Sequence, residues 1–366
     1  MPPDHSLDAL LRLALLGLLV ASVPLCWWLL RSRGAEPRRR LAALTALTLF
    51  LTFDLIAFGA FTRLSDSGLG CPDWPGCYGL ASPVGAAGHI AAEQALRPQG
   101  PVTWAKAWIE MLHRYLAMAV GLLITVAALA GWRHRRQLPH SAWWGAATLA
   151  WVIVQGLFGK YTVTLKLYPA IVTLHLLGAV LLLALLVVQH ASFERRHRPA
   201  LPAAVGRWLW PALLGLMTQV TLGGWVSTNY AVLACTDFPG CQGSLWPAMD
   251  WATAFMPLRE LGHTADGRIL PFEALVAIHW AHRLFAVVVA ALLAWTAWGL
   301  ARSPGWRGLG WLLGGLLLLQ LGTGLSNVVL RWPLAGALMH TAGAAALAGL
   351  LVLALARRRF SASVFA

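Results

Sequence analysis

Residues 155–175 read QGLFGKYTVTLKLYPAIVTLH, and residues 320–340 read QLGTGLSNVVLRWPLAGALMH. Each stretch begins at a glutamine and ends at a histidine 20 residues later (175 − 155 and 340 − 320), with a glycine and a proline at similar places between them. The chain therefore contains a repeated unit that carries a histidine inside an apolar stretch.

Two more pairs of motifs precede these stretches in the same order. A His-Arg pair lies in EMLHRYLA (110–117) and in HWAHRLFAV (279–287), and further upstream lie CPDWPGC (71–77) and CTDFPGC (235–241). The order Cys-x5-Cys, His-Arg, Gln, His thus occurs twice, offset by roughly 165 residues (340 − 175). Because ionisable residues inside a membrane are costly and are retained mainly for function, the duplicated histidines indicate a metal or heme site.

The composition is that of a membrane protein. Of the 366 residues, 58% are hydrophobic and 11% are charged, against about 25% charged in soluble domains. Stretches long enough to cross a bilayer must be helical, because lipid offers the backbone no hydrogen-bond partners. We therefore predict an all-α integral membrane protein with nine apolar helices, at 8–30, 41–63, 104–131, 143–161, 169–191, 207–229, 272–300, 308–330 and 334–356.

The net charge of +14 indicates which segments lie in the cytoplasm rather than a nucleic-acid partner. Arginines gather in alternate connecting segments, which the positive-inside rule places in the cytoplasm. The N-terminus is then outside and the C-terminus cytoplasmic, as an odd helix count requires. The partner that the basic segments meet is the lipid bilayer. These segments are 31–40, 133–136, 195–207, 302–307 and 357–359.

The first helix lies outside the repeat, and the other eight divide into two parallel, pseudo-symmetric four-helix bundles. Residues 8–30 read as a membrane helix rather than a cleaved signal peptide, because the segment is long and its start is acidic. Each half has one long outside loop, at 64–103 and 230–271. The predicted parts are an N-terminal helix with its arginine loop (1–40), an N-terminal half (41–191), a cytoplasmic linker (192–206), a C-terminal half (207–356) and a cytoplasmic tail (357–366).

The paired cysteines lie in the outside loops, where the compartment is oxidising. Proline and glycine between Cys71 and Cys77, and between Cys235 and Cys241, favour a turn that brings each pair within bridging distance. A structural disulfide in each loop is the simplest interpretation. A redox-active pair is the alternative, and a metal site lacks a neighbouring histidine or a Cys-x-x-Cys. Cys26 in the first helix reads as a small apolar residue.

Four histidines occupy duplicated positions near the outside ends of predicted helices: His113, His175, His282 and His340. A lone histidine of this kind is usually a satisfied core residue. Two in each half favour facing imidazoles, which is typical of bis-histidine heme ligation in a helix bundle. A non-heme metal would need further ligands, and too few carboxylates lie in register.

The halves differ three residues before the first histidine of each. Glu110 precedes His113 on one helix face, whereas His279 precedes His282. Glu110 is either an interfacial carboxylate or a group that acts as a base or stabilises a developing cation. The difference suggests that one half performs chemistry and the other holds a redox cofactor.

Three arginines are candidates for the propionates of a heme: Arg63, Arg114 and Arg283. The guanidinium fork suits a carboxylate, and the alternative is that these side chains extend to the outer interface. Gln155 and Gln320 are polar groups in mid-helix, for which we expect interhelical hydrogen bonds.

The motifs together resemble the heme A synthase family. The resemblance covers about residues 41–356 and rests on segments 59–79, 110–117, 161–178, 223–241, 279–284 and 338–343; Gly-Leu-x-Cys-Pro-Asp-Trp-Pro followed by Glu-x-x-His-Arg is its most specific part. The extra first helix and the cysteine pair Cys235/Cys241 depart from a minimal member.

The resemblance implies an oxidoreductase that converts the C8 methyl of heme O to a formyl group, giving heme A for terminal oxidases. It maps the substrate heme onto His113 and His175, the family's glutamate onto Glu110, and a heme b cofactor onto His282 and His340. It also implies a bacterial-type cytoplasmic membrane, heme sites near the outer face, and heme O synthase and oxidase assembly factors as partners. It does not identify the electron acceptor.

Two other classes fit parts of the pattern. A di-heme electron carrier of the quinol-oxidising kind would explain the bis-histidine symmetry, but not the Glu110/His279 difference. A transporter or heme chaperone would suit the parallel repeat, but it explains less of the histidine placement.

Overall fold

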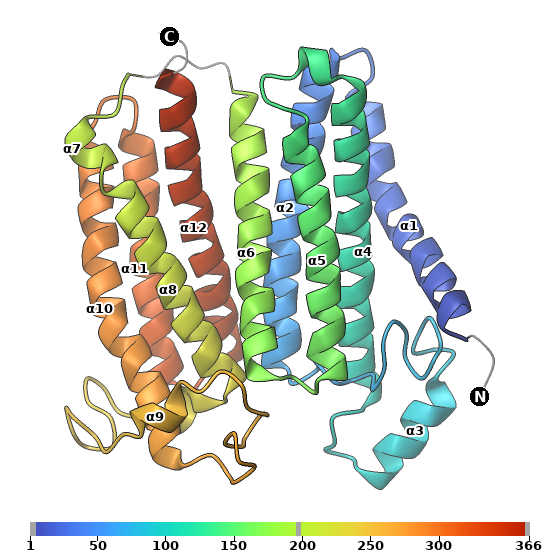
Figure 1. The fold of residues 1–366 in the computed structure, drawn as a ribbon, viewed down its shortest axis with the longest axis vertical. Coiled ribbons are helices and arrows are strands. Elements are labelled where there is room, and N and C mark those ends of the chain that lie inside the picture. Colours follow the sequence, from blue (N-terminus) through green and yellow to red (C-terminus); the bar gives the residue numbers. More distant parts are fainter. Residues whose placement is uncertain (1–4, 195–198, 363–366) are drawn as a thin grey trace. The chain divides into compact units, whose positions relative to one another are not determined.

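The computed structural model describes residues 5–194 and 199–362 (Figure 1). The remaining residues, 1–4, 195–198 and 363–366, include parts of the predicted linker and tail, and these predictions lie outside the described residues. Over the described ranges the chain forms helices and turns and no β-strand, so the all-α prediction is confirmed.

A long helix forms at each of the nine predicted positions. Their bounds are α1 His5–Arg31, α2 Pro37–Leu64, α4 Trp104–Arg133, α5 Trp143–Thr164, α6 Pro169–Ser192, α8 Leu209–Thr228, α10 Phe272–Arg302, α11 Arg307–Val329 and α12 Leu334–Ala362. The shorter elements are α3 Ala87–Leu96, α7 Ala203–Gly206, α9 Trp251–Ala254 and the 3₁₀ turns η1 Arg135–Gln137 and η2 Ala231–Ala234.

Eight of the long helices are long and apolar enough to cross a membrane, among the residues described. The exception is α5, where Gln155 and Lys160 lower the mean hydropathy of a helix otherwise rich in apolar residues. The chain is therefore a multi-pass integral membrane protein, and the eight spans are one fewer than the nine that the sequence predicts.

Several helix ends follow local sequence rules. Pro37 and Pro169 stand in the first turns of α2 and α6, where the missing N–H has no helical partner to lose. At the start of α4 the Thr103 hydroxyl accepts a hydrogen bond of 3.3 Å from the Lys106 N–H. Thr103 and Pro169 mark the starts of α4 and α6, two helices that carry predicted site residues.

The chain divides into two compact units, one ending at Leu167 and one beginning at Tyr168. In the first unit α4 packs against α1, α2 and α5. Trp28, Leu44 and Leu123 bring α1, α2 and α4 together in one buried cluster.

In the second unit α8, α10, α11 and α12 pack in a bundle around a large apolar core, and α6 packs against α8 and α12. The repeat assigns α6 to the N-terminal half, and the predicted division into two pseudo-symmetric four-helix halves stays a prediction. The loop 229–271, with α9, covers the end of this bundle where α8 ends and α10 begins (Figure 1).

The repeat extends into the backbone of the two outer loops. Asp66 and Tyr230, each seven residues after an equivalent glycine (66 − 59 and 230 − 223), both adopt a left-handed conformation, with φ of 52° and 55°. The glycines that follow the two cysteine motifs, Gly79 and Gly243, have φ of 73° and 71°. Equivalent sequence positions therefore share an unusual local conformation.

Candidate functional site: disulfide loops and histidine-bearing helices

Both predicted disulfides form. Cys71 is bonded to Cys77 and Cys235 to Cys241, and all four side chains are buried. Cys26 is a free, exposed cysteine on α1. The two predicted disulfide bonds are confirmed, and whether they are structural or redox-active stays a prediction.

An aspartate inside each disulfide loop holds the turn that follows the second cysteine. The two Asp73 carboxylate oxygens accept hydrogen bonds from the Tyr78 N–H (2.7 Å) and the Gly79 N–H (2.5 Å). The Asp237 oxygens accept from the Gln242 N–H (2.9 Å) and the Gly243 N–H (3.0 Å). The hydrogen bond from Gly243 is the largest cause that lowers the pKa of Asp237, and the hydrogen bond from Gln242 acts in the same direction.

Glu110 lies beneath the first disulfide loop, with 4% of its surface exposed. Oε2 accepts a hydrogen bond of 2.8 Å from the Cys71 N–H, and Oε1 forms an ion pair of 2.5 Å with the Arg114 guanidinium. Arg114 in turn donates to the carbonyl oxygens of Pro75 (3.1 Å) and Gly76 (2.5 Å). Glu110 is therefore a buried carboxylate held at both of its oxygens, and its role stays a prediction.

The second unit repeats this arrangement with a histidine in place of the carboxylate. Arg283 donates from Nε to His279 Nε2 (3.2 Å) and from its two terminal nitrogens to loop carbonyl oxygens. These carbonyls belong to Cys235 (2.7 Å), Asp237 (2.8 Å) and Gly240 (2.8 Å). His279 is buried, with 4% of its surface exposed.

Arg114 and Arg283 thus join each disulfide loop to the helix that carries a predicted heme ligand. Their part in propionate binding stays a prediction, as does that of Arg63 in the last turn of α2.

A glycine on a neighbouring helix lies against the imidazole of three of the four predicted ligands. An added Cβ atom on Gly59 would lie 3.0 Å from Nε2 of His113, one on Gly223 would lie 3.0 Å from Cε1 of His282, and one on Gly324 would lie 3.1 Å from Cε1 of His340. Such distances are shorter than ordinary contacts, so a larger residue would displace the rings.

His282 and His340 face each other in the second unit. Their ring centroids are 6.4 Å apart and their planes are inclined by 76°. The two imidazoles are therefore close enough to belong to one site. Two histidines from facing helices are the donor set that a bis-histidine heme requires, so the residues fit the group.

Polar side chains position these two rings. The Gln219 amide nitrogen lies 3.0 Å from His282 Nδ1 and donates to the His282 carbonyl oxygen (3.1 Å). The Thr323 hydroxyl lies 3.1 Å from His340 Nδ1, and the Gln320 amide nitrogen lies 3.4 Å from His340 Nε2. Such partners fix the orientation and tautomer of metal-binding histidines.

The predicted substrate-heme ligands lie in different units, so their pairing across one heme stays a prediction. His113, on α4, stacks on Phe58 with ring centroids 6.3 Å apart. His175, on α6, has a buried Nδ1 atom without a hydrogen-bond partner among the described residues. A buried polar atom in this state costs free energy unless a further group binds it.

Of the two mid-helix glutamines, only Gln320 makes the expected interhelical contact, to His340. The Gln155 amide is buried and has no hydrogen-bond partner within the described part of the chain, so that prediction is wrong for Gln155. Gln155 and His175 are the repeat equivalents of Gln320 and His340, and both carry polar atoms without partners.

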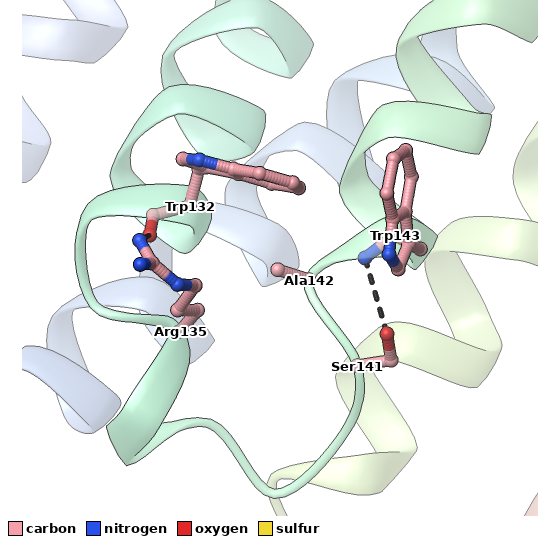
Figure 2. A pocket seen from close by; sticks show the side chains of 5 residues that line it. All are labelled: Trp132, Arg135, Ser141, Ala142 and Trp143. Atoms are coloured by element: carbon pink, nitrogen blue, oxygen red, sulfur yellow. Dashed lines mark hydrogen bonds between the residues drawn. The ribbon is translucent and has the colours of Figure 1, made fainter.

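A conventional metal site is not present elsewhere in the described chain, where no three His, Cys, Asp or Glu side chains are placed to hold an ion. A surface pocket lies between the end of α4 and the start of α5, lined by Trp132, Arg135, Ser141, Ala142 and Trp143 (Figure 2). It contains no predicted site residue, and its tryptophan–arginine lining is typical of a membrane interface.

Sequence reasoning missed Arg259, a buried arginine in the loop 229–271. With 2% of its surface exposed, it donates a hydrogen bond of 2.6 Å to the Asn229 side chain and lies 5.4 Å from the centre of the Trp225 ring. The loop has no periodic pattern, so its sequence contains no signal that this arginine is buried.

The fold and the sites define a class of protein: a multi-pass membrane protein with two disulfide loops tied by arginines to helices that carry partly buried histidines. The chain belongs to the COX15-CtaA family of cytochrome oxidase assembly proteins, whose model matches residues 42–352.

Curated relatives in this family carry the name heme A synthase. One from Shewanella oneidensis is 39% identical over 312 residues, which are 84% of this chain and 93% of the relative. Others from Rhodospirillum centenum (28% identical, 88% of this chain and 90% of the relative) and Shouchella clausii (26%, 70% and 81%) carry the same name. The predicted family is confirmed, and heme A synthase is favoured over a di-heme electron carrier.

Proposed function

We propose that this chain is an oxidoreductase that acts on heme O and oxidises its C8 methyl group to a formyl group, giving heme A. The oxidation proceeds in successive steps, hydroxylation first and then conversion to the aldehyde. Each step removes two electrons, which leave through the C-terminal half to an external acceptor. Membership of the family and the names of its relatives support the substrate. The observation that supports the assignment of roles is the exchange of Glu110 for His279 at equivalent positions, each bonded to the equivalent arginine.

The N-terminal half is proposed to bind the substrate heme O through His113 and His175. Glu110 and His113 are three residues apart, so their side chains share one face of α4. The carboxylate is held by the Arg114 guanidinium and the Cys71 N–H, which fix its position before substrate binds. A fixed, buried carboxylate beside the ligand is suited to stabilise positive charge, or to accept a proton, at the methyl carbon being oxidised.

The C-terminal half is proposed to hold a heme b cofactor between His282 and His340. When bound, this group supplies one-electron redox chemistry. The residues around it hold the two rings, since Gly223 and Gly324 leave space beside the imidazoles and Gln219 and Thr323 contact their nitrogens.

The proposed location is a bacterial-type cytoplasmic membrane, with the disulfide loops and heme sites near the outer face and the C-terminus in the cytoplasm. Two observations support this orientation. The disulfides occupy loops at the opposite helix ends from the arginine-rich segments, and disulfides persist in oxidising compartments. Heme O synthase and terminal oxidase assembly factors are the proposed partners.

The hemes carried by the purified protein test this function. Extraction and chromatographic separation should give heme b together with heme O, a hydroxylated intermediate or heme A. Heme b alone, at two per chain, would identify a di-heme electron carrier and refute the proposal. A protein without any heme would refute both.

A further inference from the structure

Arg259 is a buried cation to which the described structure gives no anion. Glu260 beside it is exposed, and no carboxylate among residues 5–194 and 199–362 forms an ion pair with the Arg259 guanidinium. Burial lowers the pKa of this guanidinium, although it stays charged. Burying a charge without a counter-charge is costly, so such a group is usually paired.

Arg259 also leaves most of its hydrogen-bond donors unused. A guanidinium has five N–H donors, and two contacts are made, to the Asn229 side chain (2.6 Å) and, more weakly, to the His263 carbonyl oxygen (3.4 Å). The Nε atom is buried and has no partner among the described residues. The Trp225 ring supports one face of the guanidinium, at 5.4 Å from the ring centre.

Two of the arginines predicted to bind propionates, Arg114 and Arg283, differ from Arg259 because protein groups occupy their guanidinium donors. Arg283 donates to three loop carbonyls and to His279, so its fork is occupied by protein groups. Arg114 is occupied by Glu110 and by the carbonyl oxygens of Pro75 and Gly76. Arg259 is the guanidinium in this comparison with donors left for a ligand.

The position of Arg259 relates it to the His282–His340 pair. Its partner Asn229 caps α8 six residues beyond Gly223 (229 − 223), the glycine that lies against His282. Six residues of helix correspond to about 9 Å along the axis, so Asn229 and the guanidinium bonded to it lie nearer the C-terminal end of α8 than Gly223 does. His282 and His340 lie ten and six residues from the starts of α10 and α12 (282 − 272 and 340 − 334). The loop 229–271 covers the start of α10 (Figure 1).

We propose that Arg259 binds a propionate of the heme held between His282 and His340, as a positioning residue for that heme. The proposal rests on the proposed function, which places a heme at this pair. Guanidinium and carboxylate form charge-assisted, bidentate hydrogen bonds, and a propionate supplies both the missing anion and the acceptors for the unused N–H groups. The loop 229–271 thereby folds over the propionate edge of the heme through Arg259, and Asn229 orients the guanidinium.

The test compares two probes, protoheme IX and its dimethyl ester, in which both propionates are neutral. Full-length protein is made without heme and titrated with each probe, in a His113→Ala background so that one site remains. The protein with arginine at position 259 should bind protoheme about tenfold or more tightly than the ester, as expected for hydrogen bonds to a charged group. In Arg259→Met the ratio of the affinity for protoheme to that for the ester should fall to near one. Arg259→Lys should retain part of this preference for protoheme.

Arg268→Met is the matched control, because Arg268 lies in the same loop and is exposed; it should keep the wild-type ratio. An intact Cys235–Cys241 disulfide and an unchanged melting temperature show that each variant is folded, and Arg259→Gln replaces the Met variant if the latter does not fold. Equal ratios in wild type and Arg259→Met, with heme bound, would overturn the role of Arg259 alone.

Two further results distinguish a failure of the Arg259 proposal from a failure of the proposed function. Wild-type protein that binds neither probe with a bis-histidine spectrum would overturn the proposed function as well. Loss of co-purified phosphatidylglycerol in Arg259→Met, with an unchanged heme-to-ester ratio, would show that the anion is a lipid phosphate and that the propionate assignment is wrong.

Discussion

Glu110 and Arg114 form an ion pair of 2.5 Å within one turn of α4, and both side chains also bond to the backbone of the Cys71–Cys77 loop. The carboxylate therefore depends on the loop for its position, and the loop depends on the carboxylate and guanidinium for three of its hydrogen bonds. The equivalent pair in the second unit, His279 and Arg283, keeps the contact with the loop and lacks the acid.

Replacing Glu110 should stop the chemistry while heme remains bound. For Glu110→Gln and Glu110→Ala we expect the conversion of heme O to fall about 100-fold or more, the range of general acid–base contributions. The measurement is the heme composition of cells or membranes that contain each variant. The control is Glu93→Ala, which removes a partly exposed carboxylate of α3 paired with Arg97. Full conversion by a heme-bound Glu110→Ala protein would exclude the proposed role.

The glycines beside the histidines give a sharper test of the heme site. On α11, a Cβ atom at Gly324 would meet the His340 ring at 3.1 Å, whereas a Cβ atom at Gly322 would meet nothing within 4 Å. We expect Gly324→Ala to lower the heme content and to alter the bis-histidine absorption spectrum. Gly322→Ala should leave both unchanged, and by helix propensity should stabilise α11 by about 1 kcal/mol. Identical spectra for the two variants would contradict the placement of His340 as a ligand.

The two disulfides should differ in their effect on activity. Mass mapping without reduction should find Cys71 linked to Cys77 and Cys235 linked to Cys241, with Cys26 free to react. Serine replacement of either pair opens a short loop and should cost about 2 kcal/mol of stability. Loss of the first pair should also lower heme O conversion, because the Cys71 N–H holds Glu110. Free thiols at all four positions would refute the disulfides.

The sequence predicted the helices well and the arginine contacts poorly, for a physical reason. An apolar run of about 20 residues has one stable form in lipid, so the nine helices fall within a few residues of their predicted bounds. The positions of loop carbonyls are not encoded in a local pattern, and Arg114 and Arg283 bond to such carbonyls. The burial of Arg259 likewise depends on how the irregular loop 229–271 folds over α8.

Acid should loosen the second disulfide loop through Asp237. Hydrogen bonds from Gly243 and Gln242 lower the pKa of this carboxyl below that of the unfolded chain. The carboxylate therefore stabilises the loop above the unfolded pKa, and this contribution is lost as the pH falls through the lower, folded value. Hydrogen exchange of the Gln242 and Gly243 amides should speed up below that pH in the wild type beyond the intrinsic trend. Asp237→Asn should remove this transition, and a transition that persists in Asp237→Asn would assign it to another group.

The proposed orientation predicts at which insertion points in the chain an alkaline phosphatase reporter is active. The arginine-rich segments 133–136 and 302–307 connect α4 to α5 and α10 to α11, and the disulfide loops lie at the opposite ends of α4 and α10. Because positive segments are retained in the cytoplasm, alkaline phosphatase inserted after Gly88 in α3 or after Gly262 in the loop 229–271 should be active. The same reporter inserted after His134 or Gly305 should be inactive. The reverse pattern would place the cysteines in the reducing compartment, where neither disulfide would persist, and would remove the basis for heme sites near the outer face.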